Sequence, residues 1–227
     1  MVTTGKIFKL REPASLPTLG SKLKDFKREE AFGEEPYHFT LLSEIQDLRL
    51  DRNTLQGVFS QDLLTYVYHR GERIPVPRTI ETFFAFNRHR DRVLLTVLEK
   101  KLRANNIANQ LSEILFITTG HITKSRILPE VLRSFHEQNA EDTKIVFFDD
   151  VDIPNINKLS LYGSSLLDTT LYDNYLRHGN VWYVVIKSKK HGHIAGVTRN
   201  GVVVIFNRVD EAEYLRYVTD EVFPLIQ

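Results

Sequence analysis

Three aspartates within four positions are the first feature of this sequence that could do chemistry. Asp149, Asp150 and Asp152 follow the apolar run 144–148, which predicts a buried strand. In an extended chain Asp150 and Asp152 face the same side, and carboxylate oxygens are the ligands that Mg²⁺ and Mn²⁺ prefer. The cluster therefore predicts a divalent-metal site of a phosphodiester hydrolase. The structural alternative is that these acids cap the next turn, since no EF-hand glycine or closing glutamate accompanies them.

Basic residues gather at two expected hairpin turns and in the turn that follows the second. Exposed ammonium and guanidinium groups can neutralise phosphates, so these turns predict contact with nucleic acid. Solvated hairpin tips would explain the same residues, because lysines also protect strand edges from pairing. The candidate residues are Arg88, Arg90, Arg92, Lys187, Lys189, Lys190 and Arg199.

Signatures of common enzymes are missing from the sequence. The histidines show no His-Glu-x-x-His spacing, no glycine-rich loop precedes a lysine, and no Gly-x-Ser-x-Gly elbow occurs. The absence of cysteine excludes disulfides, thiolate catalysis and cysteine-ligated metals. The sequence therefore leaves enzymatic activity open and favours a non-catalytic protein without a cofactor, with Mg²⁺ or Mn²⁺ at the aspartates as the alternative.

Composition predicts a cytoplasmic protein with no membrane partner. The 227 residues carry a net charge of +1, so no overall field attracts nucleic acid or anionic lipid. The sequence contains no run of about 18 apolar residues, which a membrane-spanning helix would need. The N-terminus has no apolar segment typical of a secretory signal.

The C-terminal part contains the clearest structural signals. Short β-branched and aromatic runs at 181–186, 194–198 and 202–206 predict three antiparallel strands. Asn200-Gly201 predicts a type I′ turn between the last two. Apolar residues at helical spacing after Asp210 predict a helix to the end of the chain, capped by that aspartate.

Similar patterns of apolar and turn residues predict the elements in the rest of the chain. Residues 1–36 predict a polar arm with a short helix near 20–31. Strands are expected at 37–50, 54–59, 63–69, 79–87 and 92–98, with a turn at Arg70-Gly71 and an edge or irregular crossing at Pro75 and Pro77. A helix is expected at 100–116, another from Ser125, strands at 144–148 and 159–162, and a helix at 166–177.

A strand followed by a helix occurs at 93–116 and again from 202 onward, about half the chain apart. The fold class expected is therefore α+β, with antiparallel sheets flanked by helices in two pseudo-symmetric halves. The halves would be residues 37–119 and 120–227, after the arm at 1–36.

Residues 143–226 resemble a roadblock or longin-type domain in the order of their elements, from the 181–186 strand through the Gly192 turn to the final helix. The resemblance implies a non-catalytic scaffold that pairs through sheet edges or helices and contacts small GTPases. Two strand-rich halves, each ending in a helix, also resemble the saddle of the TATA-binding protein, which would give the basic turns a larger role.

Three functions follow from these features. The first is a non-catalytic interaction module, expected to be a homodimer or part of a complex, with Tyr214 and Tyr217 of the last helix at the interface. The second is a nucleic-acid-binding protein that uses the basic turns. The third is a metal-dependent hydrolase at the aspartate cluster.

Overall fold

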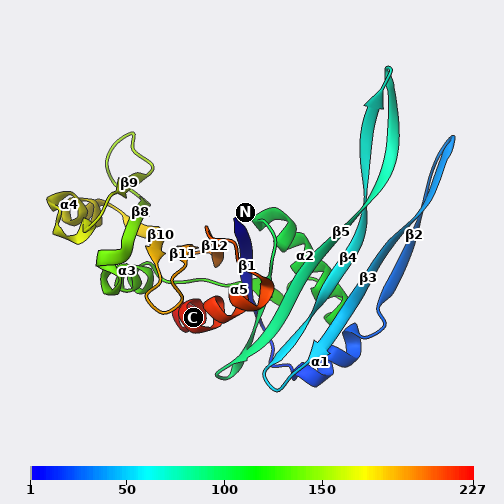
Figure 1. The fold of residues 1–227 in the computed structure, drawn as a ribbon, viewed down its shortest axis with the longest axis horizontal. Coiled ribbons are helices and arrows are strands. Elements are labelled where there is room, and N and C mark those ends of the chain that lie inside the picture. The colour runs from blue at the N-terminus through cyan, green and yellow to red at the C-terminus, as the bar shows by residue number, and fades with distance from the viewer. Residues whose placement is uncertain (1) are drawn as a thin grey trace. The chain divides into compact units, whose positions relative to one another are not determined.

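The computed structural model describes residues 2–227, which contain twelve β-strands and five α-helices (Figure 1). The chain divides into two compact units. Unit 1 comprises the segment up to Phe8 and the segment from Lys124 onward, and unit 2 comprises Lys9–Thr123. Strands pair antiparallel within both units, as predicted. Among the described helices, none is long and apolar enough to cross a membrane.

Unit 2 is a five-stranded meander with two helices on one face (Figure 1). The helices are α1 (Leu16–Leu23) and α2 (Lys101–Phe116). The strands, in spatial order, are β2 (Lys27–Glu34), β3 (Tyr37–Leu50), β4 (Thr54–His69), β5 (Glu72–His89) and β6 (Arg92–Val97).

Alternation along β4 and β5 builds the core of unit 2. Leu55 and Phe59 point from β4 to the helix side, and Phe84 and Phe86 do the same from β5, where all four are buried. Gly20 lets α1 approach Leu55 closely, because a Cβ there would lie 3.4 Å from that leucine.

Two features of the chain before α2 differ from expectation. β4 is one continuous strand where the sequence predicts two, since the polar residues Gln61 and Asp62 stay paired with Ile80 and Thr79. Residues 1–36 are not a plain solvated arm: they form β1 (Thr3–Leu10), α1 and β2, and Phe8 and Leu10 of β1 are buried. The Arg70-Gly71 turn is confirmed, with positive φ at both residues (50° and 85°).

Unit 1 is a sheet in the order β1, β12, β11, β10, β8, β9, and a short strand, β7 (Ile122–Lys124), pairs with β1. Its helices are α3 (Pro129–Gln138), α4 (Thr170–His178) and α5 (Glu211–Tyr217). Its other strands are β8 (Thr143–Asp149), β9 (Leu159–Tyr162), β10 (Asn180–Lys187), β11 (Ile194–Thr198) and β12 (Val202–Ile205).

The C-terminal meander is confirmed, but its last turn is not type I′. The loop between β11 and β12 has three residues, and Gly201 is left-handed (φ 68°) while Asn200 is not. A three-residue loop places only its final residue in this conformation. After α5 the chain continues as a π-helical turn (Val218–Val222) and a 3₁₀ turn (Phe223–Leu225).

Candidate functional site

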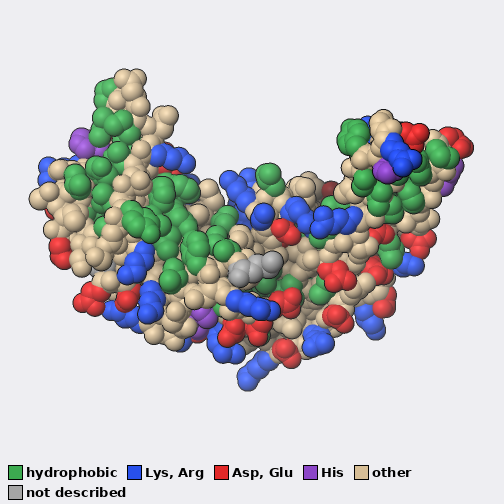
Figure 2. Space-filling model, turned by 45° about the horizontal axis from the view of Figure 1, so that its top comes forward, with side chains coloured by type: hydrophobic (Ala, Val, Ile, Leu, Met, Phe, Trp, Pro, Cys, Tyr) green, Lys and Arg blue, Asp and Glu red, His purple; other side chains and the backbone are tan. Residues whose placement is uncertain are grey.

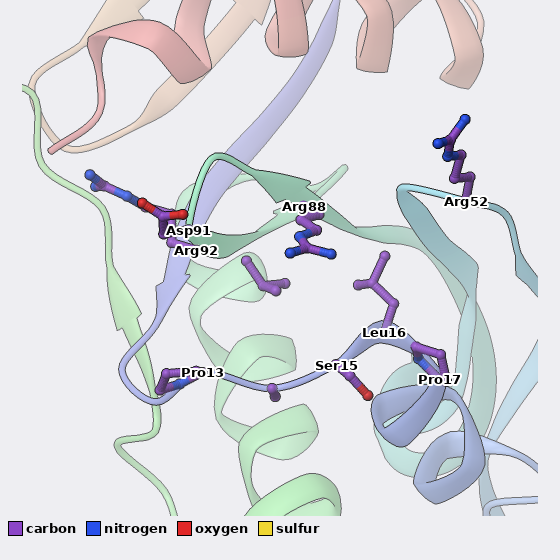
Figure 3. A pocket seen from close by; sticks show the side chains of 10 residues that line it. Pro13, Ser15, Leu16, Pro17, Arg52, Arg88, Asp91 and Arg92 are labelled. Atoms are coloured by element: carbon purple, nitrogen blue, oxygen red, sulfur yellow. The ribbon is translucent and has the colours of Figure 1, made fainter.

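Two adjoining cavities lie at one end of the unit 2 sheet, where turns meet the segment that leads into α1. The first has a volume of about 330 Å³ and is lined by residues 13–17 and by residues of the β3–β4 and β5–β6 turns (Figure 3). The second, of about 480 Å³, is lined by residues 9–13 and 90–93. Pro13, Asp91, Arg92 and Val93 line both. We call the two cavities together the basic cleft.

Six basic side chains line the basic cleft against two acidic ones. The acids are Glu12 and Asp91, and Glu12 already lies 3.5 Å from His121 Nδ1. Within residues 2–227, none of the six basic groups forms an ion pair. The six are Lys9, Arg11, Arg52, Arg88, Arg90 and Arg92.

Local backbone structure brings these side chains together. Arg90 has a left-handed φ of 53°, which makes the tight turn between β5 and β6 and pairs His89 with Arg92. The Arg88 amide donates to the Asn53 carbonyl at 3.0 Å and so ties the β5–β6 turn to the β3–β4 turn. In Figure 3 the Arg88 side chain lies over the segment from Pro13 to Pro17.

The cleft has more basic than acidic side chains, and one of its buried donors has no partner within the described residues. Arg92 Nη1 is buried without a hydrogen-bond partner, and an unpaired buried charge is costly. The pKa of the neighbouring His89 is lowered, first by burial and then by the charges of Arg90 and Arg92. An anionic ligand would accept a hydrogen bond from Arg92 Nη1 and offset the charges of Arg90 and Arg92, whereas the burial of His89 would remain.

The side chains of the cleft are suited to hold anions. Guanidinium groups donate paired hydrogen bonds to phosphate or carboxylate oxygens. The hydroxyl of Ser15 caps α1 by accepting from the Thr18 amide at 3.2 Å and lies 2.6 Å from the Thr18 hydroxyl. These contacts hold the Ser15 hydroxyl to the first turn of α1.

The structure separates the residues predicted to contact nucleic acid. Arg88, Arg90 and Arg92 line the basic cleft. The other four lie in unit 1, where Lys189 is 3.7 Å from Glu141 and Asp142, and Lys190 is 2.7 Å from Asp220. Arg199 also has acidic partners, and Lys187 is exposed.

The aspartates predicted as a metal site form ion pairs instead. Arg199 Nη2 donates to Asp149 at 2.7 Å, and its Nη1 lies 3.3 Å from Asp150. Asp152 is 2.8 Å from His178 Nδ1. Asp150 has a left-handed φ of 52°, so the chain turns after β8 and the aspartates do not share a strand face. In the described part of the chain, no group of three or more histidines and acids is placed to hold a metal ion.

Tyr214 and Tyr217, predicted at an interface, are fully buried inside unit 1. Tyr214 Oη donates to the Val203 carbonyl at 2.9 Å, and its ring lies over Gly5, where a Cβ would collide with it. Tyr217 packs against His191. Neither ring offers surface to a partner in this structure.

Lys9, Arg11 and Arg52 are the cleft residues that sequence reasoning missed. The sequence does indicate the position of Arg52, because alternate turns of a meander lie at the same end of a sheet. The β3–β4 and β5–β6 turns were therefore bound to meet. Nothing in the sequence places Lys9 and Arg11 there.

Comparison of the chain with protein-family models finds no match, and comparison with curated proteins finds none either.

Proposed function

We propose that this protein binds nucleic acid through the phosphate backbone at the basic cleft and catalyses no reaction there. The observation that carries the proposal is the set of six basic side chains, free of ion pairs, that line the adjoining cavities. Such groups bind successive phosphates and release the counterions condensed on them. The spread of charge over two cavities suits a chain of phosphates better than a single one.

The test compares two triple variants by fluorescence anisotropy with labelled duplex DNA, single-stranded DNA and RNA in low salt. Arg52, Arg88 and Arg90 are exposed, so changing all three to Gln removes charge from the cleft without opening the core. The matched control is Lys187→Gln, Lys189→Gln and Lys190→Gln, which removes the same charge from exposed positions in unit 1.

The cleft variant is expected to lose about tenfold or more in affinity, because each lost phosphate contact weakens binding. The control is expected to bind nearly as the unmodified protein does, since Lys189 and Lys190 are held by acids. No binding by the unmodified protein, or equal losses in the two variants, would overturn the assignment.

Self-association is a second candidate function, favoured by an apolar face of the unit 1 sheet. Helices α4 and α5 cover the other face: Phe148 packs on Tyr172 and Tyr175, and Tyr214 bonds to Val203. The uncovered face carries partly exposed apolar side chains, which gather at the left of Figure 2. They are Ile145, Phe147, Tyr183, Val202 and Val204.

Light scattering coupled to size exclusion tests this candidate. A dimer that dissociates on Val204→Lys would support it, because a charge on that face must stay in water. Leu171→Lys is the control, since Leu171 is an exposed apolar residue of α4 on the helix side. A monomeric unmodified protein would exclude the candidate.

We also propose that the two units are pseudo-symmetric copies in a cytoplasmic protein. Each begins with a helix, continues through antiparallel strands and ends with a helix. In unit 2 the order is α1, the meander β2–β6 and α2, and in unit 1 it is α3, β8, β9, α4, the meander β10–β12 and α5, with β10 pairing with β8. This order is compatible with the saddle-like resemblance over both units. The roadblock-type resemblance draws support from β10, β11, β12 and α5 alone.

A further inference from the structure

Past the last β3–β4 pair the unit 2 sheet splits into two hairpins, and β4–β5 continues as a two-stranded ribbon separate from β2–β3. Pairing between β3 and β4 ends at Ser43 and Gln61, whereas β4 and β5 stay paired to His69 and Glu72. We call residues 63–78 the ribbon. Its seven residue pairs extend about 23 Å at about 3.3 Å per pair, and Figure 1 shows it standing clear of α1 and α2.

The ribbon combines exposed apolar and basic side chains. Tyr68 is 76% exposed and Val67 is 51% exposed. The Arg73 guanidinium lies 3.5 Å from the centre of the Tyr66 ring, so the arginine is held over the aromatic face. The ribbon has three arginines (Arg70, Arg73 and Arg78), one histidine and one acid. Within the described residues, none of these arginines forms an ion pair.

Two prolines make the β5 edge of the ribbon unsuited to pairing with another strand. Pro75 and Pro77 are two positions apart, so their ring nitrogens face the same edge of β5. Because the ladder with β4 continues past both, that edge is the free one. It lacks two of the N–H donors that an added strand would need. The β5 edge is therefore a poor template for an added strand, and the exposed side chains on the faces of the ribbon are its better contact surface.

We propose that the ribbon lies in the major groove of double-stranded DNA. The proposal rests on nucleic-acid binding as the function and names duplex DNA as the ligand. The major groove of B-DNA is wide enough for a two-stranded ribbon, whereas the major groove of A-form RNA is too narrow for side chains to read. The arginines complement the phosphates that flank the groove, and within the described residues neither Arg70 nor Arg73 forms an ion pair.

The ribbon places its contacts on one face. Tyr66, Tyr68 and Arg73 share a face because Tyr66 pairs with Pro75 and Tyr68 pairs with Arg73. Arg70 is at the tip, where positive φ values at Arg70 and Gly71 make the tight turn. Arg70 and Arg73 would reach guanine edges or phosphates, and Tyr68 would pack against bases or sugars.

The experiment pairs affinity with a groove-specific footprint on duplex DNA. The ribbon variant combines Tyr68→Ala, Arg70→Gln and Arg73→Gln, all at exposed positions. Its control combines Tyr162→Ala, Lys189→Gln and Lys190→Gln, which removes an 83% exposed tyrosine and two charges in unit 1. Dimethyl sulfate methylates guanine N7 in the major groove, so its protection reports groove occupancy.

The expected result is N7 protection by the unmodified protein and by the control, and its loss in the ribbon variant with about a tenfold weaker affinity. The cleft variant (Arg52, Arg88 and Arg90 to Gln) should bind weakly but retain protection at saturation. If the unmodified protein binds no nucleic acid, the proposed function fails too. If the cleft variant binds weakly while the ribbon variant binds normally, or if duplex RNA or single strands bind better than duplex DNA, the ribbon proposal alone fails.

Discussion

Gly201 shows how much one residue can be required by its position. Its φ of 68° is in the left-handed region, which disfavours residues with a Cβ. Gly201 is also buried against the Ser125 hydroxyl, which donates to the Ile7 carbonyl at 2.7 Å. The Gly201 carbonyl in turn accepts from the Ile7 amide at 2.8 Å. The turn between β11 and β12 thus holds β1 in place.

Gly201→Ala is expected to lower the free energy of unfolding by about 2–4 kcal/mol, from about 1 kcal/mol of backbone strain plus displacement of Ser125. Gly71→Ala is the control, because Gly71 has a φ of 85° with nothing near its Cβ position. It should cost only the strain. Urea denaturation measures both, and equal losses would show that the Ser125 contact does not matter.

His136 is expected to make stability fall in acid. Its Nδ1 lies 3.0 Å from the Thr143 hydroxyl, which donates to the Asn139 carbonyl, so Nδ1 carries the proton and Nε2 is buried without a partner. Burial lowers the pKa of His136 to about 4, and the charge of Glu137 opposes this weakly.

The neutral form is favoured in the folded protein, so this stability is complete above the unfolded pKa of about 6.5 and is lost as the pH falls toward 4. The loss attributable to His136 should reach about 2–3 kcal/mol at about pH 4.5. His136→Gln should remove that part of the difference between neutral and acidic urea curves, and His38→Gln, at an exposed site, should not. Identical acid losses in both variants would contradict the assignment.

At the scale of elements, periodic burial decides what the sequence could predict. β3, β6, α2 and the β10–β12 meander match their expected bounds within one or two residues, because apolar residues recur at the spacing of each element. β2 was missed because its residues are almost all exposed and it is held by pairing with β3. The sequence predicts two strands in place of β4, because a polar stretch interrupts the alternation of apolar residues. The pairing of β4 with β5 nevertheless continues through that stretch.

The cap of α5 was predicted from Asp210 and is confirmed as a reciprocal capping box. Asp210 Oδ1 accepts from the Glu213 amide at 2.8 Å, and the Glu213 carboxylate accepts from the Asp210 amide at 3.3 Å. Asp210→Ala is expected to cost about 1 kcal/mol in thermal or urea unfolding, and Asp210→Asn much less, since Asn caps about as well. An Asn variant as unstable as the Ala variant would mean that charge, not the hydrogen bond, stabilises the helix.

At the scale of the whole molecule, net charge hides the candidate site. The net charge of +1 gives no sign of a basic surface, because acids elsewhere in the chain balance the basic groups. Six of those basic groups nevertheless converge at the cleft. Arg88, Arg90 and Arg92 could be picked out because they are nearly consecutive in one turn. Arg52 could also be placed there, because the β3–β4 and β5–β6 turns lie at the same end of a meander. Lys9 and Arg11 could not, because nothing in the sequence brings them to that turn. Ion pairs with Asp149, Asp150 and Asp220 likewise depend on the fold.

That local charge should give nucleic-acid binding a steep dependence on salt. If four to six groups of the cleft each neutralise one phosphate, the logarithm of the association constant should fall with the logarithm of salt concentration with a slope of about −4 to −5 for duplex DNA. Arg88→Gln alone should make the slope shallower by about one, because one fewer counterion is released. Lys190→Gln should leave it unchanged, since Lys190 is paired with Asp220 at 2.7 Å. Anisotropy titrations over a series of salt concentrations measure all three slopes. A slope near zero, or the same change in both variants, would mean that the cleft is not where phosphates bind.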